Sequence, residues 1–514
     1  MARSLALVLT LVGTLFAFPS TVSAQAPKLA RDYYEDPVDL GFKVKAIKDW
    51  EFVPPTPSER NLIGKYAPPN SQYIILKGDA TLFLNVWMLK FDRREGKKKG
   101  IADIDTWMKS RIDEGKGWRR TRTKPKDISG KVKVPARCLI FEGQSLYNMN
   151  GDPPEPIKAH VAMYELSDDL EVAIVGIGPG DKRKWRTYEK VYASMAKSFR
   201  TVEVERVVAA TSRKDPRSAK REKLAMEAAK SEDWIFEETE NYFIISNNQD
   251  REFLDELKQR LEAIRAVLER DYPFEKARRR SRRKKDDDDP EANDRSVSVA
   301  DPRVLSRTSV VRVFKDRKQY IQYGAPPSSA GYWYSVDEEL VLYDDKQNAG
   351  REYTWGVLSH EAFHQYIFYF YGNLAPHSWY NEGTGDYYFG HQFKYKRFNL
   401  AEAKGRKSVI QQMIREDNYV PLRDFVRWTK TQYYRNNELG LGGGECYAQG
   451  WSLIYFLRTG GDNKAPGWDR SWGKILDKYL VTLAETGDLD EAVDAAFGDV
   501  DWDAFEKSWY AYTK

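Results

Sequence analysis

Apolar residues follow two different spacings along the chain and divide it into two regions. In the first region, residues 34–203, short runs of β-branched and aromatic residues alternate with turn-forming stretches, a pattern typical of strands in an α+β domain. Two stretches of this region have helical spacing, Ile101–Asp113 and Lys182–Phe199. The predicted strands are Gly41–Ala46, Gln72–Leu76, Ala80–Lys90, Ala136–Glu142, Ala159–Leu166 and Leu170–Ile177.

The second region, residues 234–514, combines two predicted strands with helical patterns. Asn241–Ser246 and Ser309–Phe314 are rich in β-branched and aromatic residues, as strands are. In Arg251–Tyr272 the apolar residues recur every three or four positions, which predicts an amphipathic helix. Trp355–Tyr371 also has helical character. We therefore expect a second domain that differs in architecture from the first.

Two polar segments interrupt these patterns. Residues 204–233 are polar and helix-prone with Pro216 among them, and we predict a partly helical linker. Residues 275–298 contain RRRSRRKKDDDD, and such a run of charges predicts a disordered, solvated insertion. A nucleic-acid-binding arm is the alternative interpretation, but the acidic block next to the cations would partly neutralise it.

The first residues have the pattern of a secretory signal peptide. Arg3 precedes the apolar run Leu5–Phe18, and residues 22–24 (VSA) end in a small-x-small cleavage signal. We predict that residues 1–24 are removed before Gln25 and that the mature chain is secreted or periplasmic. An uncleaved anchor is the alternative, but the run is short for a bilayer span. We therefore expect no stable membrane insertion.

Length, charge and cysteine content narrow the possibilities further. A chain of 514 residues is too long for one ordinary core, which favours two domains. Charged residues make up 31%, yet the net charge is +5, so nucleic acid and anionic membranes are not expected partners. The two cysteines, Cys138 and Cys446, can form a disulfide outside the cytoplasm or remain buried thiols. The oligomeric state is not indicated.

Eight residues, SHEAFHQY from Ser359 to Tyr366, carry the candidate chemistry. Residues four apart on a helix share a face, so His360 and His364 can both present imidazole nitrogens to one metal ion. Glu361 is rotated by one position, where its carboxylate can take a proton from a metal-bound water without ligating the metal. An HExxH pattern also arises by chance, and two histidines are too few for a catalytic zinc site.

A third ligand follows in a second helical stretch. Glu382 opens that stretch, 18 positions after His364, and Asp386 lies four residues further on the same face. The Asp386 carboxylate can accept the free ring N–H of a ligating histidine and thereby fix its tautomer. His377 and His391 are alternatives to Glu382 as the third ligand. Otherwise we expect His377 in a surface loop and His391 off the metal-facing side.

HEAFH followed by NEGTGDY resembles the gluzincins, the zinc metallopeptidases that include thermolysin and aminopeptidase N, and the related peptidase MA-like domains. The resemblance implies a zincin-like domain over residues 234–514, with an active-site helix and a mostly helical C-terminal part. It also implies a role for each site residue. Its Zn²⁺ ligands would be His360, His364 and Glu382, its general base Glu361, and its histidine-supporting carboxylate Asp386.

The resemblance extends to flanking segments and has two departures. Ser329–Asp344 stands where the family has a strand and then the edge strand of the active-site sheet, which can bind an extended peptide. ECYAQGW, residues 445–451, resembles the helix behind the zinc helices, and it makes Tyr447 a candidate to stabilise an oxyanion. A packed core tyrosine is the alternative. The histidine-to-glutamate spacing is one residue shorter than in aminopeptidases, and Gly385 stands where many relatives carry alanine.

The N-terminal region has a weaker resemblance. Its opening YEDPVDLGFKVKAIKDWEF and its closing YEKVYASMAKSFRTV resemble the PsbP/Mog1-like group. That resemblance implies an antiparallel sheet in an α/β/α sandwich over residues 34–203 and a binding or scaffolding role. Its single histidine, His160, is expected to be structural.

The sequence as a whole predicts a secreted zinc metallopeptidase that acts on a peptide or protein substrate. No serine or cysteine nucleophile motif is present, and endo- versus exopeptidase action is open. The alternative from another class is a catalytically inactive binding or envelope-scaffold protein that retains a structural zinc. Intact Glu361 and Asp386 favour the enzyme, because a structural site does not need a base.

Overall fold

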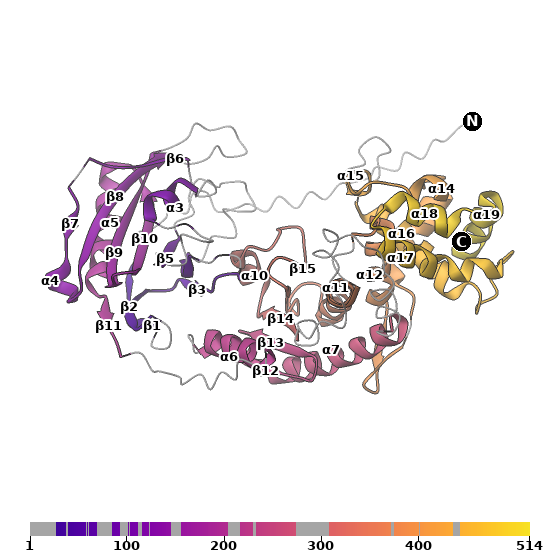
Figure 1. Cartoon of the computed structure of the whole chain (residues 1–514), viewed down its shortest axis with the longest axis horizontal. Helices are drawn as coiled ribbons and strands as arrows, with labels where there is room; N and C mark the ends of the chain where they lie inside the picture. The colour runs from indigo at the N-terminus through magenta and orange to yellow at the C-terminus, as the bar shows by residue number, and fades with distance from the viewer. Residues whose placement is uncertain are drawn as a thin grey trace, which may run out of the picture.

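The computed structural model describes residues 27–36, 40–57, 59, 61–68, 85–92, 101, 103–110, 116–122, 124–144, 156–203, 216–229, 233–273, 308–371, 375–399, 401–434 and 443–514. These residues form a mixed α+β protein with antiparallel sheets and many helices (Figure 1), so the predicted α+β class is confirmed. Three predicted segments lie outside the described residues: the signal peptide 1–24, the insertion 275–298 and the strand Gln72–Leu76.

The N-terminal domain consists of strands and helices, and three of its strands, β2 (Phe42–Ile47), β8 (Ala136–Gln144) and β10 (Leu170–Pro179), were predicted to within two residues of their observed bounds. Strands that the sequence patterns did not predict include β1 (Leu29–Asp36), which starts before the predicted boundary at residue 34. The strands are β1, β2 (Phe42–Ile47), β3 (Glu51–Val53), β4 (Leu62–Ala67), β5 (Val86–Asp92), β6 (Lys116–Arg120), β7 (Lys126–Asp127), β8 (Ala136–Gln144), β9 (Pro156–Ser167), β10 (Leu170–Pro179) and β11 (Arg200–Thr201).

The larger sheet of this domain is antiparallel throughout and carries helices on both faces. Its strands follow the order β3-β4-β5-β10-β9-β8-β6, with β7 beside β8, and β1-β2-β11 form a second small sheet. Helix α5 (Lys182–Lys197) packs on one face because its buried residues Trp185, Tyr188 and Tyr192 recur at helical spacing. Helix α3 (Ile104–Ser110), within the predicted Ile101–Asp113, covers the other face. This arrangement matches the predicted antiparallel sheet flanked by helices.

The predicted linker contains a helix that packs on the second domain. Helix α6 (Pro216–Ala229) contacts the strands β12 (Ile235–Glu238) and β13 (Tyr242–Ser246). Pro216 is its first residue, a position where the missing N–H costs no helical hydrogen bond. Leu224 is buried against this sheet, and Glu227 forms a 2.8 Å ion pair with the fully buried Arg312.

A five-stranded sheet is the centre of the second domain. Its order is β12-β13-β14-β16-β15, where β14 is Ser309–Phe314, β15 is Gly331–Tyr334 and β16 is Glu339–Tyr343. The three inner strands are parallel and both edge strands are antiparallel to their neighbours. Helices α7 (Arg251–Asp271) and α11 (Arg351–Tyr371) pack on one face and bury one continuous apolar cluster there.

The edge strand differs from the prediction. The second strand of Ser329–Asp344 was expected at the edge, but β16 lies inside the sheet and the first strand, β15, is the edge. The pairing of β16 explains this order. One side of β16 pairs in parallel with β14, so β15, which forms an antiparallel hairpin with β16, lies on the other side of β16.

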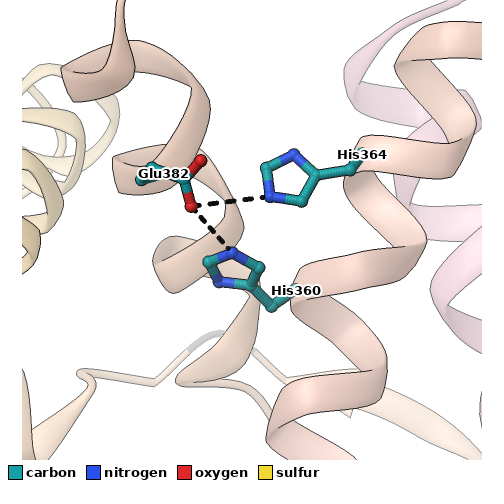
Figure 2. Close-up of side chains that lie close together, drawn as sticks. All are labelled: His360, His364 and Glu382. Carbon is teal, nitrogen blue, oxygen red and sulfur yellow. Dashed lines mark hydrogen bonds and ion pairs between the residues drawn. The ribbon is translucent and has the colours of Figure 1, made fainter. Parts of the chain in front are cut away.

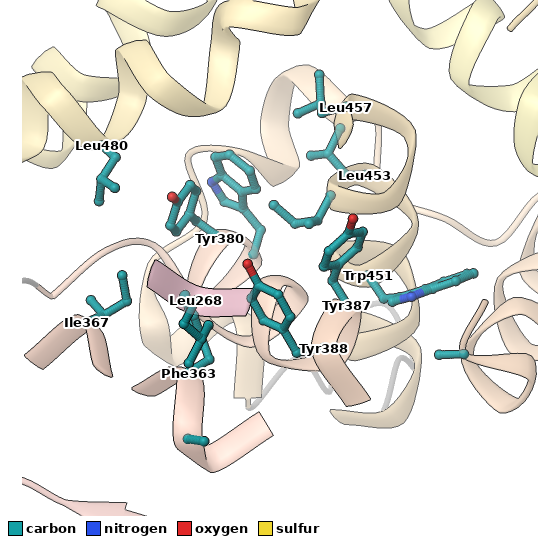
Figure 3. Packing of buried hydrophobic residues seen from close by; sticks show 14 of the residues in the cluster. Leu268, Phe363, Ile367, Tyr380, Tyr387, Tyr388, Trp451, Leu453, Leu457 and Leu480 are labelled. Atoms are coloured by element: carbon teal, nitrogen blue, oxygen red, sulfur yellow. The ribbon is translucent and has the colours of Figure 1, made fainter. Parts of the chain in front are cut away.

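The C-terminal part is mostly helical and extends the same core. Figure 3 shows side chains of α7, α11 and the later helices meeting in it. Two of the later helices approach closely at Gly383, where a Cβ would stand 2.5 Å from the Gly450 carbonyl oxygen. The helices are α12 (Ser378–Phe389), α13 (Lys404–Arg415), α14 (Leu422–Phe425), α15 (Lys430–Tyr434), α16 (Gly443–Thr459), α17 (Ile475–Thr486), α18 (Leu489–Phe497) and α19 (Trp502–Thr513), with a hairpin of β17 (Gln392–Lys394) and β18 (Arg397–Asn399).

Two remaining expectations concern membranes and cysteines. Within the part of the chain that the structure describes, no helix combines the length and apolar character that a membrane crossing requires. Cys138 in β8 and Cys446 in α16 are both buried and both free, so the thiol alternative holds in this structure. Burial raises the pKa of each thiol to about 11.

Candidate metal centre

Helix α11 carries three of the predicted site residues. Its residues Leu358, Ala362 and Phe363 are buried in the core. The imidazoles of His360 and His364 project from α11 toward α12 (Figure 2), and their ring centroids lie 4.8 Å apart. The i,i+4 spacing therefore places both rings on one side of the helix, as the motif predicted.

Helix α12 brings Glu382 to these two histidines. Glu382 Oε2 lies 3.3 Å from His360 Nε2 and 3.7 Å from His364 Nε2 (Figure 2). One possible ligand atom from each residue falls within 4.8 Å of the other two, and no other such group of three occurs among the described residues. The helix starts at Ser378, so Glu382 lies in its second turn and does not open it, contrary to the expectation.

Gly385 is required by the close approach of His360. A Cβ at Gly385 would stand 2.6 Å from Cε1 and 2.7 Å from Nδ1 of the His360 ring. Non-bonded contacts of a Cβ atom below 3.0 Å are essentially never observed in proteins. Glycine at this position, where the resembling family often has alanine, thus lets α12 pack directly against the imidazole of His360.

Asp386 lies one helical turn after Glu382 and contacts the other nitrogen of His360. The distance from His360 Nδ1 to Asp386 Oδ1 is 3.2 Å, and the carboxylate is buried. On its far side Asp386 Oδ2 lies 2.6 Å from Arg406 Nε in α13. A carboxylate held in this way fixes the tautomer of the imidazole and leaves Nε2 free to bind a metal. Arg406 is a partner that the sequence analysis missed.

The charges of the cluster shift two pKa values in opposite directions. Burial by itself would lower the pKa of His360, but the Asp386 and Glu382 carboxylates raise it well above its usual value. Burial by itself would raise the pKa of Glu382, but His364 and His360 hold it well below its usual value. The site thus favours positive charge between its carboxylates, which is the charge that a divalent cation brings.

Glu361 contacts the edge strand β15. Its Oε2 accepts a 2.9 Å hydrogen bond from the backbone N–H of Trp333 in β15. Gly331 allows this approach, because a Cβ there would stand 2.5 Å from Val357 and 3.4 Å from Glu361 Cγ. The candidate base is therefore held against β15, the last strand of this sheet among the described residues.

Two tyrosines lie beside the cluster, of which the sequence analysis named one. The ring of Tyr447 in α16 stacks near His360, with centroids 6.4 Å apart, and Arg406 lies 4.9 Å from the Tyr447 ring centroid. Tyr434, the last residue of α15, lies near Glu382, and its ring centroid is 6.2 Å from that of Tyr447. Burial, followed by the charge of Glu382, raises the pKa of both phenols, so both hydroxyls keep their protons.

No sequence signal marks Tyr434, Arg406 or Trp333. Tyr434 is one of 31 tyrosines, and it lies 52 positions after Glu382 without a recognisable motif. Trp333 contributes a backbone N–H, to which its side-chain identity gives no clue. These contacts depend on how α13, α15 and β15 pack around the two motif helices.

The other histidines lie outside the cluster. His377 is buried before α12 and does not lie in a surface loop, because its backbone N–H and its Nδ1 both bond the Tyr479 hydroxyl, at 2.8 and 2.9 Å. His391 Nδ1 lies 3.0 Å from the Tyr388 carbonyl oxygen, and burial lowers its pKa to about 4. Neither replaces Glu382 beside the two motif histidines. His160 is buried in β9.

Comparisons with known proteins reach only part of the chain. It is similar in structure to cyanobacterial PsbP (CyanoP) from Synechocystis, with 12% identity and a TM-score of 0.23 over 35% of this chain and 97% of that chain. It is also similar to the Ran-binding protein Mog1p from Saccharomyces cerevisiae, with 11% identity and a TM-score of 0.19 over 32% of this chain and 91% of that chain. At these TM-scores neither likeness supports a shared function.

The sequence matches no family model, and it matches no curated protein. The two similar structures belong to the PsbP/Mog1-like group that residues 34–203 resemble. The gluzincin resemblance has no counterpart among these findings and stays a prediction.

Proposed function

We propose that this chain is an exported zinc-dependent metallopeptidase with its active site between α11 and α12. The observation that carries the proposal is the convergence of His360, His364 and Glu382 within 4.8 Å, with Glu361 next to them on the helix. The two histidines lie on a different helix from Glu382, so it is the packing of α11 against α12 that brings the three side chains together.

The residues present fit a zinc ion. Two imidazole nitrogens and one carboxylate oxygen are the usual protein ligands of a catalytic zinc, which keeps a further position open for water. Asp386 on His360 Nδ1 supplies the hydrogen bond that such ligands commonly make. When bound, Zn²⁺ would polarise a water molecule and the carbonyl of the scissile peptide bond.

Each residue of the chain then has a definite task. His360, His364 and Glu382 hold the ion. Glu361 takes a proton from the attacking water and delivers it to the leaving amine. We propose that the hydroxyls of Tyr434 and Tyr447 donate to the carbonyl oxygen as negative charge develops on it.

The substrate we propose is an extended peptide segment paired with β15. Among the described residues this strand is the last of its sheet and lies next to Glu361, and an edge strand can bind another strand by main-chain hydrogen bonds. A peptide placed there would lie along α11 with its backbone near the cluster.

One observation favours the alternative of an inactive protein with a structural zinc. Glu361 already accepts a hydrogen bond from the Trp333 N–H, and a carboxylate engaged in this way is a weaker base. In a working enzyme, substrate binding on β15 must release or share this bond.

The substitution Glu361→Gln distinguishes the two functions. We expect the variant to keep stoichiometric zinc and to lose hydrolysis of a peptide library by about 10²-fold or more, because the amide cannot accept the proton. Glu352→Gln is a matched control, since Glu352 lies on the same helix but its side chain is 90% exposed. Cleavage products are followed by mass spectrometry, and zinc by elemental analysis.

Equal hydrolysis by the Glu361→Gln variant and the unchanged protein would disprove the general-base mechanism. Bound zinc without hydrolysis in the unchanged protein would instead support the structural site.

A further inference from the structure

The two domains meet where the large N-terminal sheet ends. Strand β3 is the last strand in that sheet, and helix α10 (Arg317–Tyr323) of the second domain lies against it. Lys318 Nζ lies 3.1 Å from Glu51 Oε1, with side chains 26% and 28% exposed. Val53 and Ala67 are buried in one apolar cluster with Tyr320. The contact thus covers an edge strand that would otherwise present open backbone groups.

The same helix holds the start of β15. The Tyr320 hydroxyl lies 2.6 Å from Ser329 Oγ, two residues before the strand, and the rings of Tyr320 and Tyr332 have centroids 5.8 Å apart. Tyr323 donates a 2.6 Å hydrogen bond to Glu339 in the neighbouring strand β16. Helix α10 is therefore tied to both strands of the hairpin.

Strand β15 in turn holds the candidate base. The Trp333 N–H donates to Glu361 at 2.9 Å, and Gly331 lies against the same helix at Val357. A continuous series of contacts therefore runs from β3 through α10 and β15 to α11, elements that follow one another across the middle of Figure 1.

We propose that the N-terminal domain is a positioning element for this site. Its edge strand β3 supports α10, and α10 keeps the edge strand β15 at the distance from α11 that the Trp333–Glu361 hydrogen bond requires. The importance of this positioning for catalysis rests on the proposed peptidase function, but the coupling between the domain contact and β15 does not.

Charge reversal at the domain contact tests the coupling in the full-length protein. Lys318→Glu and Glu51→Lys each place two like charges at the contact, and the double variant restores an attractive pair of opposite orientation. Lys43→Glu is the control, because Lys43 forms a 3.2 Å pair with Glu35 within the N-terminal domain, where the side chains are 35% and 49% exposed. Amide hydrogen exchange of residues 329–334, measured by mass spectrometry, reports on β15 without requiring activity.

We expect each single reversal to speed exchange of residues 329–334 by about two- to fivefold, the scale of a partly exposed ion pair, and the double variant to return it toward the original rate. The Lys43→Glu control should leave the exchange rate of residues 329–334 unchanged. Where peptide hydrolysis is measurable, kcat/KM should be lower in each single variant than in the original protein and should recover in the double variant. Unchanged exchange in both single variants, or no recovery in the double variant, would overturn the proposal. If the charge reversals change the exchange of residues 329–334 as expected but the protein hydrolyses no peptide, the positioning proposal stands and only the peptidase function is contradicted.

Discussion

Two buried histidines, one in each domain, have pKa values that shift in opposite directions. His160 in β9 is 4% exposed, and burial lowers its pKa to about 4. His360 in α11 is 8% exposed, yet the carboxylates of Asp386 and Glu382 raise its pKa. The difference shows that burial alone makes a histidine neutral, whereas paired carboxylates make the same residue a favourable place for positive charge.

Tyrosines of the two domains also differ in what lies near their hydroxyls. In the N-terminal domain, Tyr164 and Tyr192 donate to the backbone carbonyls of Ala196 and Ile177, at 2.8 and 2.7 Å. In the second domain, Tyr433 likewise donates to a backbone carbonyl, that of Cys446, whereas the 37% exposed Tyr434 lies near the carboxylate of Glu382. Core tyrosines of both domains are thus satisfied by the backbone, whereas Tyr434 and the two motif histidines lie beside a carboxylate. Such convergence is characteristic of functional sites.

Removing one histidine from each domain should give the largest difference. His360→Ala should lower zinc affinity on the order of 10²–10³-fold, because it removes one of three ligands. His160→Ala should leave zinc affinity unchanged. Titration with a competing chelator measures both. Full zinc affinity in the His360→Ala variant would contradict the ligand assignment.

The pH dependence of stability should also differ. His160 has a folded pKa of about 4 against about 6.5 unfolded, so its neutral state favours folding above pH 6.5, and this contribution is lost as the pH falls from about 6.5 to about 4. The loss amounts to about 3 kcal/mol at most. The contribution of His360 in metal-stripped protein has the opposite sign, since its raised pKa stabilises the fold below pH 6.5 and less as the pH rises.

Urea unfolding at several pH values, followed by tryptophan fluorescence, measures this effect. His160→Gln should flatten the pH dependence between pH 4 and 6.5. An unaltered slope in that variant would mean that other groups cause the acid sensitivity.

A tyrosine substitution in each domain should separate catalysis from stability. Tyr434→Phe should lower kcat about 10²-fold with little change in stability, because it removes a donor to the developing oxyanion. Tyr192→Phe should cost about 1 kcal/mol of unfolding free energy and leave kcat unchanged. If Tyr447→Phe lost activity and Tyr434→Phe did not, the oxyanion donor would be Tyr447.

A methyl group at Gly385 should have the smallest effect on the site. Gly385→Ala pushes on the His360 ring and should lower zinc affinity about tenfold, with a stability loss of about 1–3 kcal/mol. Gly405→Ala in α13 is the control, because its Cβ meets no atom within 4 Å and should be neutral or slightly stabilising. Calorimetry and zinc titration of both variants test this, and equal behaviour would argue against close packing of the ring.

Local sequence patterns predicted the long helices better than the short strands and the order of the strands in the sheet. The helices at Arg251–Tyr272 and Lys182–Phe199 were predicted to within two residues, because their apolar spacing is strong and Asp250 and Asp181 cap their starts. Strands β3, β4 and β6 were missed, since short strands in an antiparallel sheet have few residues to set a pattern. The edge position of β15 was also missed, because strand order depends on pairing partners elsewhere in the chain.

The sequence by itself determined the candidate chemistry of this protein. His360, Glu361 and His364 are placed by the geometry of one helix, which is local and needs no other part of the fold. Only the tertiary structure brought Glu382 within 3.7 Å of both histidines and set Tyr434 against Glu382. Only the tertiary structure also placed the N-terminal domain behind β15. Contacts between distant segments depend on how whole helices and sheets pack, which no local spacing specifies.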